Sequence, residues 1–179
     1  MARIEESVEI KCPVDKIFDY TTEANNWPKW QTIIREAEQT SQGRWCPGPA
    51  FLGVSHMLGL NMKWTARATQ YEQNKQWSKD ITCGPMFVAE HVTYNPVGAD
   101  IKFTIAYNLK VGALFWPFSP LIARSMSRET KKSLGNLTKL LETRPDNLSG
   151  NAGPQNAEHQ KIGAQLRPML AAAPARERF

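Results

Sequence analysis

The sequence predicts an α+β protein in which a curved antiparallel sheet of about seven strands wraps around one long C-terminal helix. Short segments of alternating apolar and polar residues recur from residue 2 to residue 109, and brief turns separate them. A short amphipathic helix interrupts these segments near the N-terminus, and a long amphipathic stripe follows them over residues 120–143. Connections this short favour antiparallel neighbours. A sheet that grips a single helix leaves room between them for a cavity.

The N-terminal part of the chain is predicted to hold one strand and a short helix. Residues 2–10 alternate and form the strand, and Pro13 can occupy the first helical turn, where a missing N–H costs nothing. A further short turn over residues 23–26, capped by Thr22, is predicted to end at Trp27-Pro28.

The remaining strands are predicted from period-two alternation between turn residues. Residues 41–49 are rich in Gly, Pro and Ser and predict a loop. The predicted strands are 30–38, 51–57, 62–71, 76–83, 87–94 and 101–109.

The long helix has clear start and stop signals. Ser119 is expected to cap it, Pro120 suits its first turn, and Pro145 ends it. Gly135 lies in its interior, where glycine costs about 1 kcal/mol relative to Ala. Gly135 could allow close packing on the sheet or leave space for a ligand.

Composition narrows the functional classes. The formal net charge is +5, but basic and acidic residues are interspersed, which argues against nucleic-acid binding. The three widely spaced cysteines indicate neither a disulfide framework nor a metal site, and the sequence predicts no cofactor. No signal peptide or membrane-spanning run is visible, so we expect a cytoplasmic protein. We predict a folded domain over residues 1–144 and a disordered tail over residues 145–179, which has few bulky apolar residues.

Several stretches resemble a known family. The chain is similar to the polyketide cyclase/dehydrase group of the START/Bet v 1-like (SRPBCC) superfamily. The resemblance implies the helix-grip fold and covers about residues 2–143. Members include aromatases/cyclases, lipid carriers and hormone receptors, so it does not select a function. The stretches that carry it are VEIKCPVDKIFDY at 8–20, NNWPKW at 25–30, WTARATQYE at 64–72, GPM at 84–86 and LTKLLE at 137–142.

The strand alternation and the helix stripe predict which side chains face the cavity. Glu90 is the exception on this apolar face: desolvation would raise its pKa and make it a candidate general base, unless it lies near the rim and reaches water. His91 is expected to point outward, although a one-residue bulge would exchange the two, and His56 is expected on the surface. The candidate cavity residues are Trp64, Trp77, Ile81, Val88, Glu90, Val92, Tyr94, Phe103, Ile105, Tyr107, Ile122 and Met126.

Three functional hypotheses follow. The first is non-covalent binding of a lipid-like or polyketide-like molecule, oriented by one or two polar groups. The second is a cyclase or aromatase in which Glu90 or a tyrosine moves protons; Tyr94 and Tyr107 could contact a ligand or fill the core. The third, a protein-interaction module, rests on the tail and the basic face of the helix. The sequence predicts no oligomeric state.

Overall fold

The computed structural model describes residues 2–41, 48–57 and 59–143. The chain divides into two compact units, Met1–Leu148 and Ser149–Phe179, and all described residues belong to the first. The predicted disordered tail lies outside the described residues. No helix in the described part of the chain combines the length and apolarity needed to cross a bilayer.

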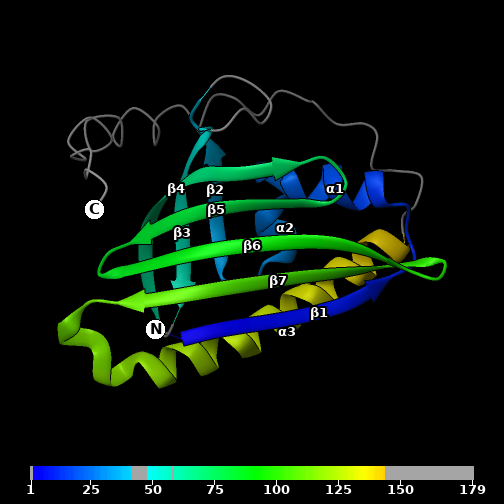
Figure 1. The fold of residues 1–179 in the computed structure, drawn as a ribbon. Helices are drawn as coiled ribbons and strands as arrows, with labels where there is room; N and C mark the ends of the chain where they lie inside the picture. Colours follow the sequence, from blue (N-terminus) through cyan, green and yellow to red (C-terminus); the bar gives the residue numbers. More distant parts are fainter. Residues whose placement is uncertain (1, 42–47, 58, 144–179) are drawn as a thin grey trace. The chain divides into compact units, whose positions relative to one another are not determined.

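One antiparallel sheet forms the body of the structure. Its strand order is β1-β7-β6-β5-β4-β3-β2 (Figure 1). Strands β2 to β7 therefore pair with their neighbours in sequence, whereas β1 pairs with β7, the last strand. The predicted curved sheet with a long C-terminal helix is therefore confirmed. The strands are β1 (Ala2–Ile10), β2 (Ile34–Gln39), β3 (Ala50–Met57), β4 (Leu60–Glu72), β5 (Gln76–Cys83), β6 (Met86–Val97) and β7 (Asp100–Val111).

Two groups of helices accompany the sheet: one follows β1 in the sequence, and the other follows β7. Figure 1 shows the long helix α3 running along β1, and α2 packs against β2 and α3. The helical elements are α1 (Val14–Thr22), η1 (Ala24–Asn26), α2 (Trp27–Trp30), η2 (Ala113–Phe118) and α3 (Ser119–Thr143).

The predicted strand over residues 30–38 begins too early. Pro28 occupies an early position of α2 instead of ending a turn, and the Gln31 N–H closes this helix by donating to the Trp27 carbonyl at 2.8 Å. Proline fits the first helical turn because its missing N–H has no partner there. The strand therefore starts at Ile34.

Two predicted helix caps are also corrected. Thr22 is the last residue of α1 and donates its hydroxyl to the Phe18 carbonyl at 2.7 Å, while the side chain of Glu23 caps η1. Ser119 is the first residue of α3, because the turn of η2 leads directly into it. Gly135 is exposed, and an added Cβ would meet nothing, so neither expected role for it is correct.

An aromatic core fills the space between the sheet and the N-terminal helices. Trp27 stacks on Trp77 with ring centroids 6.0 Å apart, and Phe18 contacts Tyr94 at 5.2 Å. The Tyr94 hydroxyl accepts a hydrogen bond from Trp77 Nε1 at 3.0 Å and shares another with Thr21 at 2.5 Å. Side chains close this end of the interior, and the cavity described below lies nearer α3 and the strands β3–β6.

Candidate functional site

A cavity of about 70 Å³, partly open to solvent, lies inside the sheet beside α3. Its wall is apolar apart from a few side chains, and four methionines contribute to it. Methionine side chains are unbranched and adapt to irregular shapes. The lining residues are Gln31, Ile33, Ile34, Ser55, Met57, Met62, Trp64, Lys79, Ile81, Cys83, Met86, Val88, Glu90, Tyr107 and Met126.

A buried ion pair stands in this wall. Lys79 of β5 and Glu90 of β6 are direct cross-strand partners, and Nζ lies 3.2 Å from Oε1. The lysine and glutamate side chains are 1% and 2% exposed. Both residues fall on the inward face because side chains alternate along each strand. The sheet register thus places opposite charges together in an apolar interior.

The pair satisfies its charges without satisfying its hydrogen bonds. Lys79 Nζ and Glu90 Oε1 interact as an ion pair at 3.2 Å, and Oε1 makes no hydrogen bond of standard geometry to any described residue. The Lys79 ammonium also lies 3.5 Å from the ring centroid of Trp27 and 4.6 Å from that of Trp77. These ring faces attract the cation.

Burial shifts both ionisation equilibria toward the neutral forms. Desolvation raises the pKa of the Glu90 carboxyl, and the charge of Lys79 opposes that rise. Desolvation likewise lowers the pKa of the Lys79 amine, against the pull of Glu90. A proton shared by this pair is therefore held less firmly by the amine than in water, and the carboxyl is a better proton acceptor than usual.

Two further polar atoms of the cavity wall lack partners. Gln31 Nε2 and Trp64 Nε1 are buried and donate no hydrogen bond to any described residue. Gly53 pairs with Trp64 across β3 and β4, and a Cβ on Gly53 would lie 2.4 Å from the indole ring. Glycine is thus required there for the indole to lie against the strand. Unsatisfied buried donors are costly, so a bonding partner in the cavity would stabilise them.

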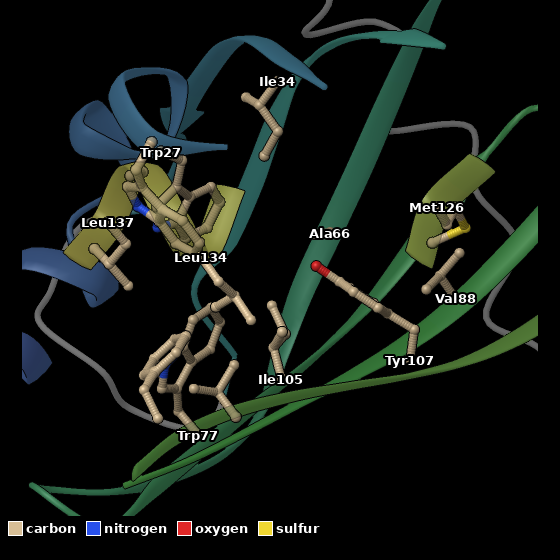
Figure 2. Close-up of a cluster of buried hydrophobic side chains, with 14 of the residues drawn as sticks. Trp27, Ile34, Ala66, Trp77, Val88, Ile105, Tyr107, Met126, Leu134 and Leu137 are labelled. Atoms are coloured by element: carbon tan, nitrogen blue, oxygen red, sulfur yellow. The ribbon is translucent and has the colours of Figure 1, made fainter. Parts of the chain in front are cut away.

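Tyr107 adds a hydroxyl to the same region. Figure 2 shows its side chain reaching from β7 into the interior, with Val88 and Met126 near its base. Tyr107 hydrogen-bonds the side chain of Thr130, whose own hydroxyl donates to the Met126 carbonyl at 2.8 Å. Burial and the nearby Glu90 raise the pKa of Tyr107 well above its ordinary value. The phenol therefore stays neutral and acts as a hydrogen-bonding group.

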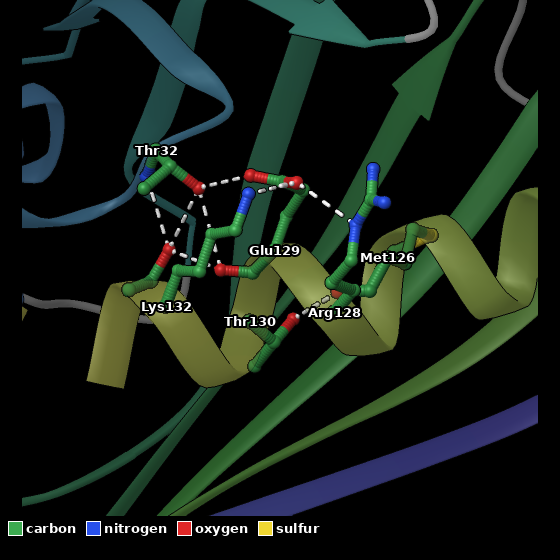
Figure 3. Close-up of polar contacts among 7 residues, drawn as sticks. Thr32, Met126, Arg128, Glu129, Thr130 and Lys132 are labelled. Carbon is green, nitrogen blue, oxygen red and sulfur yellow. Dashed lines mark hydrogen bonds and ion pairs between the residues drawn. The ribbon is translucent and has the colours of Figure 1, made fainter. Parts of the chain in front are cut away.

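A polar contact with α3 holds the segment that carries Gln31. The Thr32 N–H donates to Ser133 Oγ at 3.0 Å, and the Thr32 hydroxyl donates to Glu129 Oε2 at 3.0 Å (Figure 3). Glu129 also pairs with Lys132 at 3.0 Å and Arg128 at 3.4 Å. These bonds fix the α2–β2 turn on the helix, and so they position Gln31 beside the cavity.

The structure divides the candidate cavity residues into two groups. The first group lines the cavity and comprises Trp64, Ile81, Val88, Glu90, Tyr107 and Met126. The second group is buried in the core away from the cavity wall and comprises Trp77, Val92, Tyr94, Phe103, Ile105 and Ile122. The five strand residues point inward as the alternation predicts, and Trp77, Tyr94 and Phe103 among them pack on the rings of Trp27, Phe18 and Trp30.

The histidine alternatives are decided by the register. Glu90 is 3% exposed, so it lies inside rather than at a wet rim. His91 is on the outer face, where its Nδ1 is 2.6 Å from Ser78 Oγ, and His56 is bonded to Asn61 at 2.7 Å. No bulge interrupts the pairing of β5 with β6 at these positions.

Sequence reasoning missed Lys79 and Gln31. Lys79 had a usable signal: it lies midway between Trp77 and Ile81, which were both predicted to face inward, so alternation places it there too. Gln31 had none, because it falls in the turn that was predicted as a strand.

Comparisons with known proteins place this fold. The family model described as "Polyketide cyclase / dehydrase and lipid transport" matches residues 1–142. The chain belongs to this family. No curated protein matches the sequence.

Solved structures agree on the architecture. An aromatase/cyclase, Zhui, from a Streptomyces species has a TM-score of 0.71 at 11% identity, with 84% of this chain and 99% of that chain covered. A protein from Thermus thermophilus reaches 0.70 at 9% identity, covering 81% and 100%. A START superfamily protein from Mycobacterium smegmatis reaches 0.59 at 15% identity, covering 79% and 95%. At these identities the likeness shows the helix-grip fold alone.

Proposed function

We propose that this protein binds a small molecule with an apolar body and one oxygen-bearing polar group in the cavity beside α3. The observation that carries the proposal is the Lys79–Glu90 pair, which is buried in an apolar wall with Glu90 Oε1 lacking a hydrogen bond among the described residues. Buried polar atoms are normally bonded. A ligand hydroxyl that donates to Glu90 would remove this cost.

The arrangement of donors indicates the polar group's chemistry. Two lining residues, Gln31 and Trp64, have buried donors without a hydrogen-bond partner among the described residues, and the ammonium of Lys79, paired with Glu90, adds a positive charge. Glu90 Oε1 is the unpartnered acceptor. A hydroxyl can donate and accept at once, and a carbonyl oxygen accepts from several donors. Enol, phenol and β-hydroxyketone groups match this pattern.

The size of the cavity sets a condition on the ligand. A volume of about 70 Å³ holds a few water molecules, whereas a dry cavity of about 150 Å³ is enough for benzene. A lipid-like or polyketide-like ligand must therefore displace side chains. The methionines Met57, Met62, Met86 and Met126 are suited to this because their side chains change rotamer readily. We propose that the cavity expands on binding, in a cytoplasmic protein that does not use nucleic acid.

Ligand titration with cavity-filling variants tests the proposal. The wild-type chain should bind an apolar fluorescent probe with about micromolar affinity, near −8 kcal/mol. Ile81→Trp should weaken binding at least tenfold because the indole would occupy the cavity. Val8→Trp is the matched control: Val8 is also a half-buried strand residue packed on the core, but it does not line the cavity. Native mass spectrometry of the purified chain should show a retained small molecule. Equal probe binding by both variants would contradict the proposal.

A second candidate function is a cyclase or aromatase that acts on a ligand in the same cavity. The observation in its favour is the raised pKa of Glu90 beside an amine of lowered pKa, an arrangement suited to proton transfer. Glu90→Gln distinguishes the two. In a binding protein it should keep ligand affinity within about tenfold, or 1.4 kcal/mol. In an enzyme it should abolish turnover of a poly-β-keto substrate while binding persists.

A further inference from the structure

We propose that one end of this molecule docks on an anionic lipid surface. This end, called the mouth end here, comprises the ends of β3 and β4 at Met57 and Leu60, the ends of β5 and β6 at Cys83 and Met86, and the segment from Val111 to Arg124. The argument rests on the exposed side chains of these elements and does not require the proposed ligand.

Strand register brings these elements together at one end of the strands. Met57 pairs with Leu60, and Cys83 pairs with Met86, which pairs in turn with Val111. The Gly112 N–H donates to the Pro85 carbonyl at 2.9 Å, which ties the start of η2 to the β5–β6 hairpin. In Figure 1 the chain leaves β7 at this end and turns directly into the start of α3.

Large apolar side chains are exposed at the mouth end. Trp116 is 66% exposed, Phe118 58% and Leu121 57%, and all three fall within six residues. Leu60 is 64% exposed on the neighbouring hairpin, and Phe87 is 37% exposed. At the opposite end of the strands, the exposed large apolar side chains of the described residues are Tyr71 and Val97, at 36% and 44%. Patches of this kind mark interaction surfaces.

The charge beside the patch selects the partner. Between residues 110 and 132 the chain has five basic residues and one acidic residue, Glu129. Arg124 and Arg128 are exposed, and with Leu121 they lie within about one-sixth of a helical turn at 100° per residue. Arg128 and Lys132 contact Glu129, and Lys131 lies 3.7 Å from Glu6; no ion pair of Arg124 appears among the described residues. Aromatic and leucine side chains rimmed by arginine fit an interface with anionic headgroups.

A second copy of this chain fits the surface less well. Arg124 and Arg128 are exposed beside the apolar residues, so two copies joined by this surface would each bring the same positive charge into the contact. Like charges in a desolvated contact oppose association. An anionic bilayer instead accepts the apolar side chains below its headgroups and pairs the arginines with phosphates.

The mouth end also adjoins the cavity. Met57, Cys83 and Met86 line it, and Met126 lines it from α3, about 1.4 helical turns beyond Leu121. An apolar molecule that left a bilayer at this surface would meet the methionine-rich wall first. Docking there would present the cavity to the source of an apolar ligand.

Vesicle flotation with the full-length chain tests the proposal. Wild type should float with vesicles of 70% phosphatidylcholine and 30% phosphatidylglycerol and bind vesicles of phosphatidylcholine alone at least fivefold more weakly. The triple variant Trp116→Ser/Phe118→Ser/Leu121→Ser should lose at least tenfold in binding. Arg124→Gln/Arg128→Gln should lose several-fold on the anionic vesicles. The matched control is Tyr71→Ser/Val97→Ser, which changes two exposed apolar residues at the opposite end of the strands. It should bind as wild type does. Circular dichroism verifies the fold of each variant.

Several outcomes would overturn the proposal. These are no flotation of wild type on anionic vesicles, equal binding to neutral and anionic vesicles, or wild-type binding by the triple variant. A wild-type dimer in sedimentation equilibrium that becomes monomeric in the triple variant, without flotation of either protein, would assign the surface to a second copy instead.

Discussion

Two ion-paired clusters of this protein have nearly the same distances and opposite surroundings. Lys79 and Glu90 lie 3.2 Å apart with side chains 1% and 2% exposed. Lys132 and Glu129 lie 3.0 Å apart on the surface of α3, with side chains 57% and 19% exposed. Water screens the surface pair, whereas the buried pair has given up its hydration. Similar distances therefore correspond to very different energies.

The contrast distinguishes a candidate functional site from a polar contact that holds two elements together. The surface cluster joins α3 to the turn at Thr32, and each of its charges keeps contact with water. The buried pair is poorly explained as a source of stability, because apolar residues of similar volume commonly stabilise a core as well or better. Its place in the apolar wall of the cavity supports the proposed role in binding or proton transfer. Four predictions test this contrast, from the largest expected effect to the smallest.

The largest effect is expected from breaking the buried pair. Lys79→Met should lower the free energy of unfolding by about 3–5 kcal/mol, because it leaves Glu90 buried without a counter-charge. The double variant Lys79→Met/Glu90→Leu should recover most of this loss. Urea unfolding of the two single variants and the double variant measures the coupling. Additive losses would show that the two residues do not stabilise each other.

The same variant should acquire a distinct pH dependence. Burial raises the pKa of Glu90, and in Lys79→Met the opposing charge is gone. Above the ordinary carboxyl pKa the unfolded chain loses this proton while the folded chain keeps it. Stability should therefore fall as pH rises, by up to about 1.4 kcal/mol per unit, until the raised pKa is passed. Urea midpoints at pH 5, 6 and 7 should fall more steeply in Lys79→Met than in Lys79→Met/Glu90→Leu. Parallel profiles would refute the assignment to Glu90.

A smaller effect is expected at the contact between Thr32 and α3. Thr32→Val should cost about 1 kcal/mol, because the Thr32 hydroxyl no longer donates to Glu129 and Glu129 loses a partner. It should also weaken probe binding, since Gln31 is positioned by the same turn. The control is Thr138→Val: among the described residues, the Thr138 hydroxyl donates to the Leu134 carbonyl of its own helix, at 3.0 Å. A Thr138→Val effect on probe binding as large as that of Thr32→Val would remove the link to Gln31.

The smallest effect is expected from the exposed partner. Lys132→Gln should change stability by no more than about 0.5 kcal/mol, and the difference from wild type should shrink in 1 M NaCl. The destabilisation by Lys79→Met should persist at that salt concentration, because mobile ions do not reach the buried pair. Thermal melts in low and high salt measure both. Equal salt sensitivity would mean that Lys79 is accessible to ions.

The sequence indicated most of the architecture because alternation is a local property. The inward positions on β4 to β7, including Glu90, follow from a period of two, and the stripe of α3 follows from a period of 3.6. The order of the elements predicted a curved sheet around the helix, and the resemblance to the helix-grip family, which the family match confirms, pointed to the same fold. The same local patterns misplaced residues 30–33, where an early proline starts a helix that the alternation concealed.

By itself the sequence determined which side chains point inward, because each strand's pleat fixes that direction. Only the tertiary structure decided which inward side chains meet open space: Trp77 and Tyr94 are sealed by Trp27 and Thr21, whereas Tyr107 and Met126 are not. It also decided that Lys79 stands opposite Glu90, since register depends on turns and packing summed over two strands. A local period can assign a face, but the volume left between a sheet and a helix depends on every side chain that fills it.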